Sequence, residues 1–214
     1  MSPFDVRDKR VLVTGGTRGF TLTTVRANLM TPSGPETLAR EVSAAGPVDA
    51  LVHNAATGVH KPLAELGARH LAAVFGVNVA AFLELANRLR PAMPTGGRIV
   101  AISSEGARHA VPAYGAVGSS KAALEAVCRQ LAVEWAPAIS VNVVAPGLLD
   151  THSLAAMDDG AGRRAREIAG SPLGRLVTTD EVAQVVHFLL SAASAGIVGQ
   201  TLVVDGGRSV RAGL

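Results

Sequence analysis

The sequence predicts an α/β protein built on a doubly wound, mainly parallel sheet. Short apolar, β-branched runs alternate with longer helical runs along the whole chain of 214 residues. The first of these runs, "RVLVTGG", passes directly into a glycine turn. Hydrophobic residues make up 48% of the chain and charged residues 17%, which predicts a folded, soluble protein with a sizeable core. Alternation of this kind places helices on both faces of a parallel sheet.

Five runs are predicted to be strands, and their carboxyl ends should meet at one edge of the sheet. They are "RVLVTGG", "VDALVHNAA", "GRIVAISS", "ISVNVVAPG" and "GQTLVVDGG". Ligands of open parallel sheets collect at this edge. The polar residues and turn that close the strands should therefore line one cleft: Thr14, Asn54, Ser103, Ser104 and Pro146–Gly147.

Helices are predicted over four ranges, 34–46, 68–93, 115–136 and 179–194, because apolar residues recur there at helical spacing. Thr179 precedes "DEVAQVV" and is the expected N-cap of the last helix, with acidic residues in the first turn. No internal repeat, linker or low-complexity tract interrupts the pattern, so we expect one domain over residues 1–214.

Composition argues against several classes of protein. The net charge is only +3 and aromatic residues make up 3%, which disfavours a nucleic-acid partner. Apolar runs stay below the roughly 18 residues of a membrane span, and the N-terminus lacks a signal-peptide cleavage site. Cys128 is the only cysteine, which fits a reducing cytoplasm, and its helical context predicts a buried spectator thiol. The histidines have no metal-ligand spacing, so no metal site is predicted; they are read as surface or core residues (His53, His60, His70, His109, His152 and His187).

The stretch "AYGAVGSSKAALE" contains a candidate reactive pair, Tyr114 and Lys121. Seven helical residues advance about 700°, so the two side chains return to within roughly 20° of each other, about 10 Å apart along the axis. They can therefore face the same cleft. On this observation alone, chance placement of a tyrosine and a lysine on one helix face is an equally good explanation.

The motifs around this pair resemble those of the short-chain dehydrogenase/reductase family, in order and across nearly the whole chain. They are "VTGGTRG", "HNAA", "ISSEG", "VNVVAPG" and "GQTLVVDGG". The resemblance implies a Rossmann-like fold. Common members of the family space tyrosine and lysine as Y-x3-K, but Gly118 occupies that lysine position here and the spacing is Y-x6-K. This spacing, with "VHNAATGV" and "SPLGRLVTTDEVAQVVHFLLS", is similar to NADPH-dependent enoyl-acyl-carrier-protein reductase III.

The resemblance implies a role for each of four residues. Tyr114 would donate a hydrogen bond or proton to the enolate oxygen of an enoyl thioester, and Lys121 would hold the nicotinamide ribose hydroxyls. Ser104 would lie on the substrate side of the cleft, and Asn78 would support the lysine's helix. For Ser104, a strand-end hydroxyl that satisfies backbone groups is an equally good reading.

The same resemblance implies an NADPH site, with NADH as a possible substitute, but this site is unusual near the N-terminus. Thr21 stands where the family has the last glycine of its loop, and "TVRANLMTP" resembles the family's third strand. About one strand and two helices of the family fold are therefore absent. Either the protein lacks them or the printed sequence omits them, and an intact mass distinguishes the two. The implied cofactor residues are Gly15, Thr17, Arg18, Gly19, Asn28, Leu29, Asn54, Ala55, Lys121, Pro146 and Gly147.

Three functions are compatible with these observations. The first is an enoyl-thioester reductase acting on a small acyl thioester, which acyl carrier protein would carry. The second is a ketone or alcohol oxidoreductase of the same family. The third is a non-redox or inactive protein on this scaffold, because the dinucleotide site is incomplete. In each case we expect a cytoplasmic homo-oligomer, a dimer or tetramer, paired through the helices that hold "AAFLELANRLRPAM" and "KAALEAVCRQLAVEWA".

Overall fold

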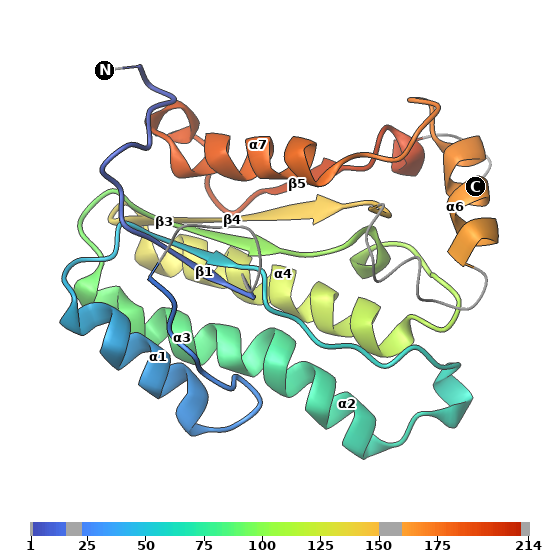
Figure 1. Cartoon of the computed structure of the whole chain (residues 1–214), viewed down its shortest axis with the longest axis horizontal. Coiled ribbons are helices and arrows are strands. Elements are labelled where there is room, and N and C mark those ends of the chain that lie inside the picture. Colours follow the sequence, from blue (N-terminus) through green and yellow to red (C-terminus); the bar gives the residue numbers. More distant parts are fainter. Residues whose placement is uncertain (1, 16–22, 150–159, 211–214) are drawn as a thin grey trace.

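The computed structural model describes residues 2–15, 23–149 and 160–210 (Figure 1). Its five strands form one parallel sheet in the order β1-β2-β3-β4-β5, so the predicted sheet is confirmed. Each strand pairs in parallel with the next one along the chain, for example Leu12 with Leu51 and Val143 with Thr201. The strands are β1 (Val11–Thr14), β2 (Ala50–His53), β3 (Gly97–Ile102), β4 (Ile139–Pro146) and β5 (Thr201–Val204).

Helices cover both faces of this sheet, as Figure 1 shows. On one face, α1 (Ser33–Ala44), α3 (Ala81–Leu89) and α4 (Gly115–Trp135) pack against the sheet; Phe82, Leu85 and Leu124 are fully buried there. On the other face, α7 (Thr179–Leu190) packs on β3 and β4 through Val182 and Leu189. The sheet therefore lies between two layers of helices, each packed against it through apolar side chains.

The second predicted helix is one continuous helical run, Ala68–Ala92, of 25 residues. It consists of α2 (Ala68–Phe75), a π-helical segment (Gly76–Ala80), α3 and a short 3₁₀ turn (Arg90–Ala92). By length and composition alone this run could cross a membrane, with a mean hydropathy of 1.4 in its most apolar window. Its α3 part lies within the main hydrophobic core, which accounts for much of this composition.

The remaining helical elements are short or were not expected from the sequence. An additional helix, α6 (Gly160–Gly170), was missed because its mixture of arginine, glycine and alanine gives little apolar periodicity. Four further 3₁₀ turns are η1 (Leu63–Glu65), η4 (Glu105–Ala107), η5 (Ala192–Ser194) and η6 (Arg208–Val210).

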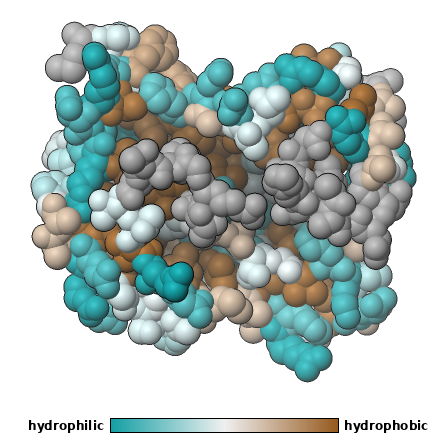
Figure 2. Space-filling model, viewed as in Figure 1, coloured by the Kyte–Doolittle hydropathy of each residue, from teal (hydrophilic) through white to brown (hydrophobic). Residues whose placement is uncertain are grey.

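The strand expected from "TVRANLMTP" is not formed. Residues 23–28 have no regular secondary structure, a turn follows at residues 29 and 30, and β1 forms the edge of the sheet. The apolar residues Val25, Ala27 and Leu29 pack against the core below the sheet instead. The segment does not pair with the free edge of β1. On the face shown in Figure 2, hydrophobic residues are visible in the middle of the molecule, and Val13 of β1 is 39% exposed.

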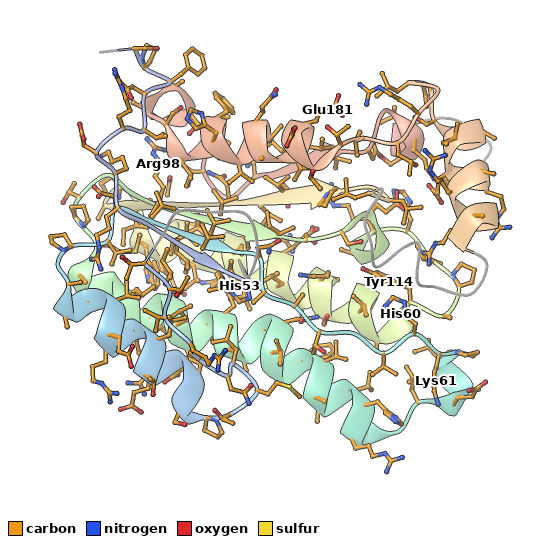
Figure 3. The ribbon with its side chains drawn as sticks, viewed as in Figure 1. His53, His60, Lys61, Arg98, Tyr114 and Glu181 are labelled. Atoms are coloured by element: carbon orange, nitrogen blue, oxygen red, sulfur yellow. The ribbon has the colours of Figure 1, made fainter. Side chains whose placement is uncertain are left out.

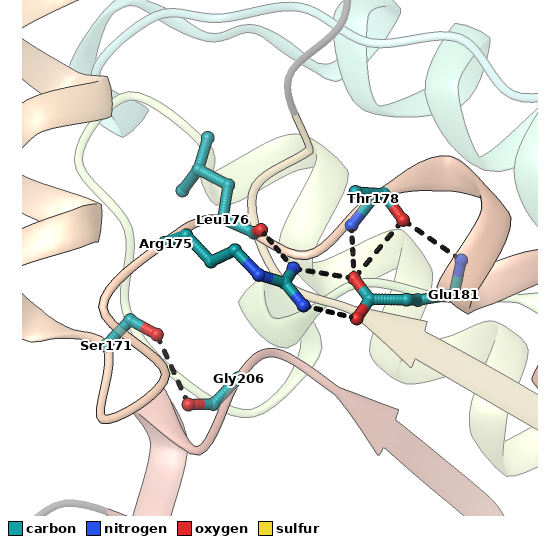
Figure 4. Close-up of polar contacts among 6 residues, drawn as sticks. All are labelled: Ser171, Arg175, Leu176, Thr178, Glu181 and Gly206. Atoms are coloured by element: carbon teal, nitrogen blue, oxygen red, sulfur yellow. Dashed lines mark hydrogen bonds and ion pairs between the residues drawn. The ribbon is translucent and has the colours of Figure 1, made fainter.

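The predicted N-cap of α7 was wrong by one residue. Thr178, not Thr179, caps the helix: its Oγ1 accepts a hydrogen bond from the Glu181 N–H at 3.2 Å, and Glu181 Oε2 accepts from the Thr178 N–H at 2.8 Å. Arg175 donates to the same carboxylate at 2.7 and 2.9 Å (Figure 4). This capping box fixes the start of the helix.

Candidate active site

A cleft of about 370 Å³ lies at the carboxyl ends of β3 and β4. Of the strand-end residues expected there, Ser103, Ser104, Pro146 and Gly147 line it, and Thr14 and Asn54 do not. Loops after β2, β3 and β4 form its walls together with the first two turns of α4. Tyr114, Ser104 and Lys121 all line it, so the folded chain brings three of the four predicted catalytic residues together.

The two serines that end β3 have different environments. Ser103 is buried, and its hydroxyl donates to the buried Glu125 carboxylate at 2.7 Å. Arg108 pairs with the same carboxylate at 3.3 Å, which ties the η4 loop to α4. Ser104 lines the cleft and caps η4, its Oγ accepting from the Gly106 N–H at 3.2 Å. Ser104 is therefore the serine that can meet a substrate, while it also satisfies a backbone donor.

Tyr114 stands at the N-cap of α4, not within the helix. The preceding residue, Ala113, has φ of 58°, in the left-handed region that an alanine rarely adopts. The Tyr114 hydroxyl donates to Ser104 Oγ at 3.3 Å, and its ring lies 5.5 Å from the ring of His60. Figure 3 shows Tyr114 and His60 next to each other. The strained turn thus presents the hydroxyl beside Ser104.

Lys121 is almost fully buried, yet its ammonium group reaches the cleft. The side chain is 5% exposed, and Nζ donates to the carbonyl oxygen of Ile102 at 2.7 Å. Burial lowers the pKa of Lys121 to about 8. A lysine held in this way is a donor for hydroxyl groups of a ligand, and part of its charge is lost near neutral pH.

Asn78 lies in the π-helical segment, fully buried, and does not line the cleft. Its amide Nδ2 donates to Thr57 O at 3.0 Å and to Ser120 Oγ at 2.9 Å, and its Oδ1 accepts from the Thr57 N–H at 2.9 Å. These bonds join a loop of the cleft to the residue before Lys121. Asn78 therefore acts on the cleft through its neighbours.

The predicted cofactor residues after β1 and β2 form a close backbone contact. Thr14 Oγ1 accepts from the Asn54 and Ala55 N–H groups at 3.1 and 3.0 Å. Gly15 has φ of 75°, and a Cβ added there would lie 3.0 Å from the Ala55 backbone. Only glycine fits this cradle without strain. The other predicted residues of the glycine loop, Thr17, Arg18 and Gly19, lie outside the described residues.

Asn28 and Leu29, two of the implied cofactor residues, do not line the cleft. Asn28 Oδ1 accepts from the Met30 N–H at 3.0 Å, so its side chain serves the turn before α1. Leu29 packs against the core. Both positions were assigned on the basis of the third strand, which is not formed.

Pro146 and Gly147 end β4 and line the cleft opposite Tyr114's loop, and the Gly147 N–H donates to Val204 O at 3.0 Å. With the buried ammonium of Lys121, these residues fit the nicotinamide half of a dinucleotide. The side toward the adenosine half differs, because no strand is described beyond β1.

Three charged or titratable residues of the cleft were not predicted: His60, Glu105 and Arg163. Burial, with the nearby carboxylates of Glu167 and Asp205, raises the pKa of Glu105. Glu105 could have been suspected from "ISSEG", since it follows Ser104 directly. His60 and Arg163 reach the cleft only through tertiary structure, and Arg163 comes from the unpredicted α6.

His53 lies beside the site but within the core (Figure 3). Its Nδ1 is 3.3 Å from Thr14 Oγ1, its ring packs 5.1 Å from that of Phe82, and Nε2 has no hydrogen-bond partner among the described residues. Burial lowers its pKa to about 3, so the ring is neutral. In the described part of the chain, no cluster of three or more His, Cys, Asp or Glu side chains could hold a metal ion.

Known proteins share both the sequence pattern and the fold. A family model described as "Enoyl-(Acyl carrier protein) reductase" matches residues 16–209. The 1-cyclohexenylcarbonyl-CoA reductase of Streptomyces collinus is 39% identical over 199 residues, which cover 91% of this chain and 70% of that protein. A tropinone reductase homologue of Arabidopsis thaliana is 32% identical, covering 82% and 68%.

Among solved structures, a putative NAD(P) dependent gluconate 5-dehydrogenase from Beutenbergia cavernae with bound NADP is 33% identical. Its TM-score is 0.83, with 88% of this chain and 77% of that chain covered. The motifs, the parallel sheet and the cleft at its carboxyl edge agree with these matches. The chain belongs to the short-chain dehydrogenase/reductase family of oxidoreductases.

Proposed function

We propose that this protein is an NADPH-dependent reductase of the carbon–carbon double bond of enoyl thioesters. The observation that carries the proposal is the placement of the Tyr114 hydroxyl and the Lys121 ammonium in one cleft at a separation of seven residues. The 39% identity to a reductase of an unsaturated CoA thioester supports it. The description of the matching family model points to the same chemistry.

The chain's own residues supply charge stabilisation and orientation. When an α,β-unsaturated thioester is reduced at its β-carbon, negative charge develops on the thioester oxygen. Tyr114, at the N-cap of α4, is placed to donate a hydrogen bond to that oxygen, which stabilises the charge. Ser104, 3.3 Å from the tyrosine oxygen, keeps the hydroxyl directed into the cleft. Asn78 bonds to Thr57 in the loop after β2 and to Ser120 in α4, the helix that carries Lys121.

The cofactor would be held from the side of β4 and α4. Lys121 would hold the ribose hydroxyls of the nicotinamide half, and the Pro146–Gly147 backbone would line its ring. When bound, NADPH or NADH supplies the hydride. The acyl group, carried on coenzyme A or acyl carrier protein, would enter past His60 and Arg163.

Reduction of a ketone is the second candidate, because relatives of this chain include a tropinone reductase homologue. A ketone that accepts hydride at its carbonyl carbon needs the acid at the adjacent carbonyl oxygen, and the six-residue gap moves the tyrosine away from that position. Consumption of NADPH with acetoacetyl-CoA but not with crotonyl-CoA would select the ketone reductase. A protein that binds neither nicotinamide cofactor would belong to the third class, a scaffold whose sheet ends at β1.

Replacement of Tyr114 by phenylalanine tests the proposal directly. Tyr114→Phe removes one hydroxyl and keeps the ring, so the protein should remain folded. Loss of a donor aimed at developing charge costs about 10²–10³ in kcat. The assay is crotonyl-CoA reduction, followed by the loss of NADPH absorbance. Ser119→Ala is the control, since that hydroxyl bonds to Gly115 O on α4 and does not line the cleft. A fully active Tyr114→Phe variant would exclude this mechanism.

A further inference from the structure

The η4 loop and helix α4 meet backbone to backbone at two glycines, Gly106 and Gly118. A Cβ added to Gly118 would lie 2.4 Å from the carbonyl oxygen of Gly106. A Cβ added to Gly106 would lie 2.6 Å from both Cδ1 and Cε1 of the Tyr114 ring. Real Cβ atoms essentially never come closer than 3.0 Å to such atoms. Neither position accepts even an alanine unless the loop, the helix or the ring moves.

This contact determines where the Tyr114 ring can lie. The ring packs against Gly106, where the absence of a side chain leaves room for it. The tyrosine hydroxyl reaches Ser104, two residues earlier in the same loop. The tyrosine carbonyl accepts from the Gly118 N–H at 2.7 Å, so Gly118 also anchors the first turn of α4. Arg108 and Ser103, both bonded to Glu125, hold the loop against the helix on either side of Gly106.

Gly118 also bears on why the lysine of the reactive pair stands at position 121 and not at position 118. It occupies the position of the lysine in the Y-x3-K pattern. A lysine there would have to pass through the Gly106 carbonyl, whereas Lys121, nearly one turn later, has a path to the Ile102 carbonyl.

We propose that Gly106 and Gly118 are positioning residues for Tyr114. Their backbone contact places the tyrosine ring beside Ser104. It also requires a residue without a side chain at position 118, where α4 faces the η4 loop. The proposal concerns the place of the tyrosine and does not depend on which acyl substrate is reduced. Both glycines act through Tyr114 and the loop, not by contact with the reacting atoms.

Gly106→Ala is the decisive variant, because its methyl group meets a side-chain ring that can swing away. The protein should therefore fold, with the tyrosine displaced from Ser104. A displacement of about 1 Å in a reacting group can cost about 100-fold in rate, so we expect kcat to fall by about that factor with little change in KM. The Cβ added in Gly118→Ala would collide with the Gly106 carbonyl oxygen, so this variant should also lower the free energy of unfolding.

Gly76→Ala is the matched control. Gly76 is also helical, with φ of −55° and ψ of −47°, but an added Cβ there meets no atom within 4 Å. This variant should keep parental kcat and be slightly more stable, since alanine favours helix. It separates the effect of the contact from that of a helical glycine in general.

A second readout requires neither substrate nor cofactor. Tyr114 is the only tyrosine, so ring-labelled tyrosine gives a single set of NMR resonances. These should shift in Gly106→Ala and Gly118→Ala and stay in place in Gly76→Ala. An inactive parent would count against the proposed function alone, and the resonances would still decide this proposal. Parental resonances in a folded Gly106→Ala variant, or a parental kcat, would overturn it.

Discussion

At the scale of single residues, Lys121 shows how function opposes stability in this cleft. Lys121 is 5% exposed, and its ammonium group, which donates to the Ile102 carbonyl, gives up most of its hydration. The folded-state pKa of about 8 lies below the ordinary value of 10.5. Folding therefore favours the neutral amine, and stability is lost as the pH falls from 10.5 through 8. The full penalty is present at pH 7.

Lys121→Met should consequently be more stable than the parent at pH 7 and unable to hold the cofactor ribose. The gain in unfolding free energy is expected to be on the order of 2–3 kcal/mol at pH 7 and to shrink as the pH rises from about 8 to 10.5. Thermal melts at pH 7 and pH 10 measure the gain, and NADPH titration measures the loss of affinity. A variant that melts below the parent at pH 7 would contradict the argument.

At the scale of elements, the capping box of α7 is a local motif that could be predicted from the sequence almost completely. Thr178 and Glu181 each satisfy a backbone N–H of the other, and Arg175 holds the carboxylate (Figure 4). The hydrogen bonds from Arg175 and Thr178 lower the pKa of Glu181 to about 2. The sequence pattern identified the helix start to within one residue.

Thr178→Ala should lower the unfolding free energy by about 1 kcal/mol, the typical cost of losing an N-cap side chain. Thr179→Ala is the natural control, because Thr179 is already the first residue of the helix and Thr178 is the residue that caps it. Urea unfolding of the two variants compares them. Equal losses in both would place the cap elsewhere.

Elements were predictable where local pattern and tertiary context agree. All five strands and the helices around Leu85, Leu124 and Val182 have strong apolar periodicity, and each is formed. Residues 24–32 have a strand-like pattern too, but in the structure they do not pair with the free edge of β1. Val25, Ala27 and Leu29 are instead partly buried against the helical layer.

At the scale of the whole molecule, some residues of the site could be identified from local sequence, and others reach it only through the tertiary fold. Tyr114 and Lys121 were identified from their spacing on one helix together with the family resemblance, which also assigned Ser104 at a strand end. His60 and Arg163 come from a loop and from α6, and only the folded chain brings them to the cleft. Asn28 was assigned to a third strand that is not formed among the described residues, and its side chain accepts from the Met30 N–H in the turn before α1.

The outer surface of α4 leads to a prediction about assembly. Val133 is 78% exposed on a helix whose other apolar residues, such as Leu131 and Trp135, are buried. One exposed apolar side chain is ordinary on a protein surface, but this one lies on a helix whose apolar spacing predicts a contact with a second copy of the chain. We propose that α4 pairs with itself in a homo-oligomer. Light scattering should give a multiple of the chain mass for the parent.

Val133→Glu should reduce that mass to one chain, because it would place two carboxylates opposite each other at a symmetric contact. Val210→Glu is the matched control: Val210 is 83% exposed and lies in η6, outside α4. Its mass should equal that of the parent. Circular dichroism spectra establish that both variants are folded. A parent with the mass of a single chain, or a Val133→Glu variant that keeps the parental mass, would show that α4 is not the interface.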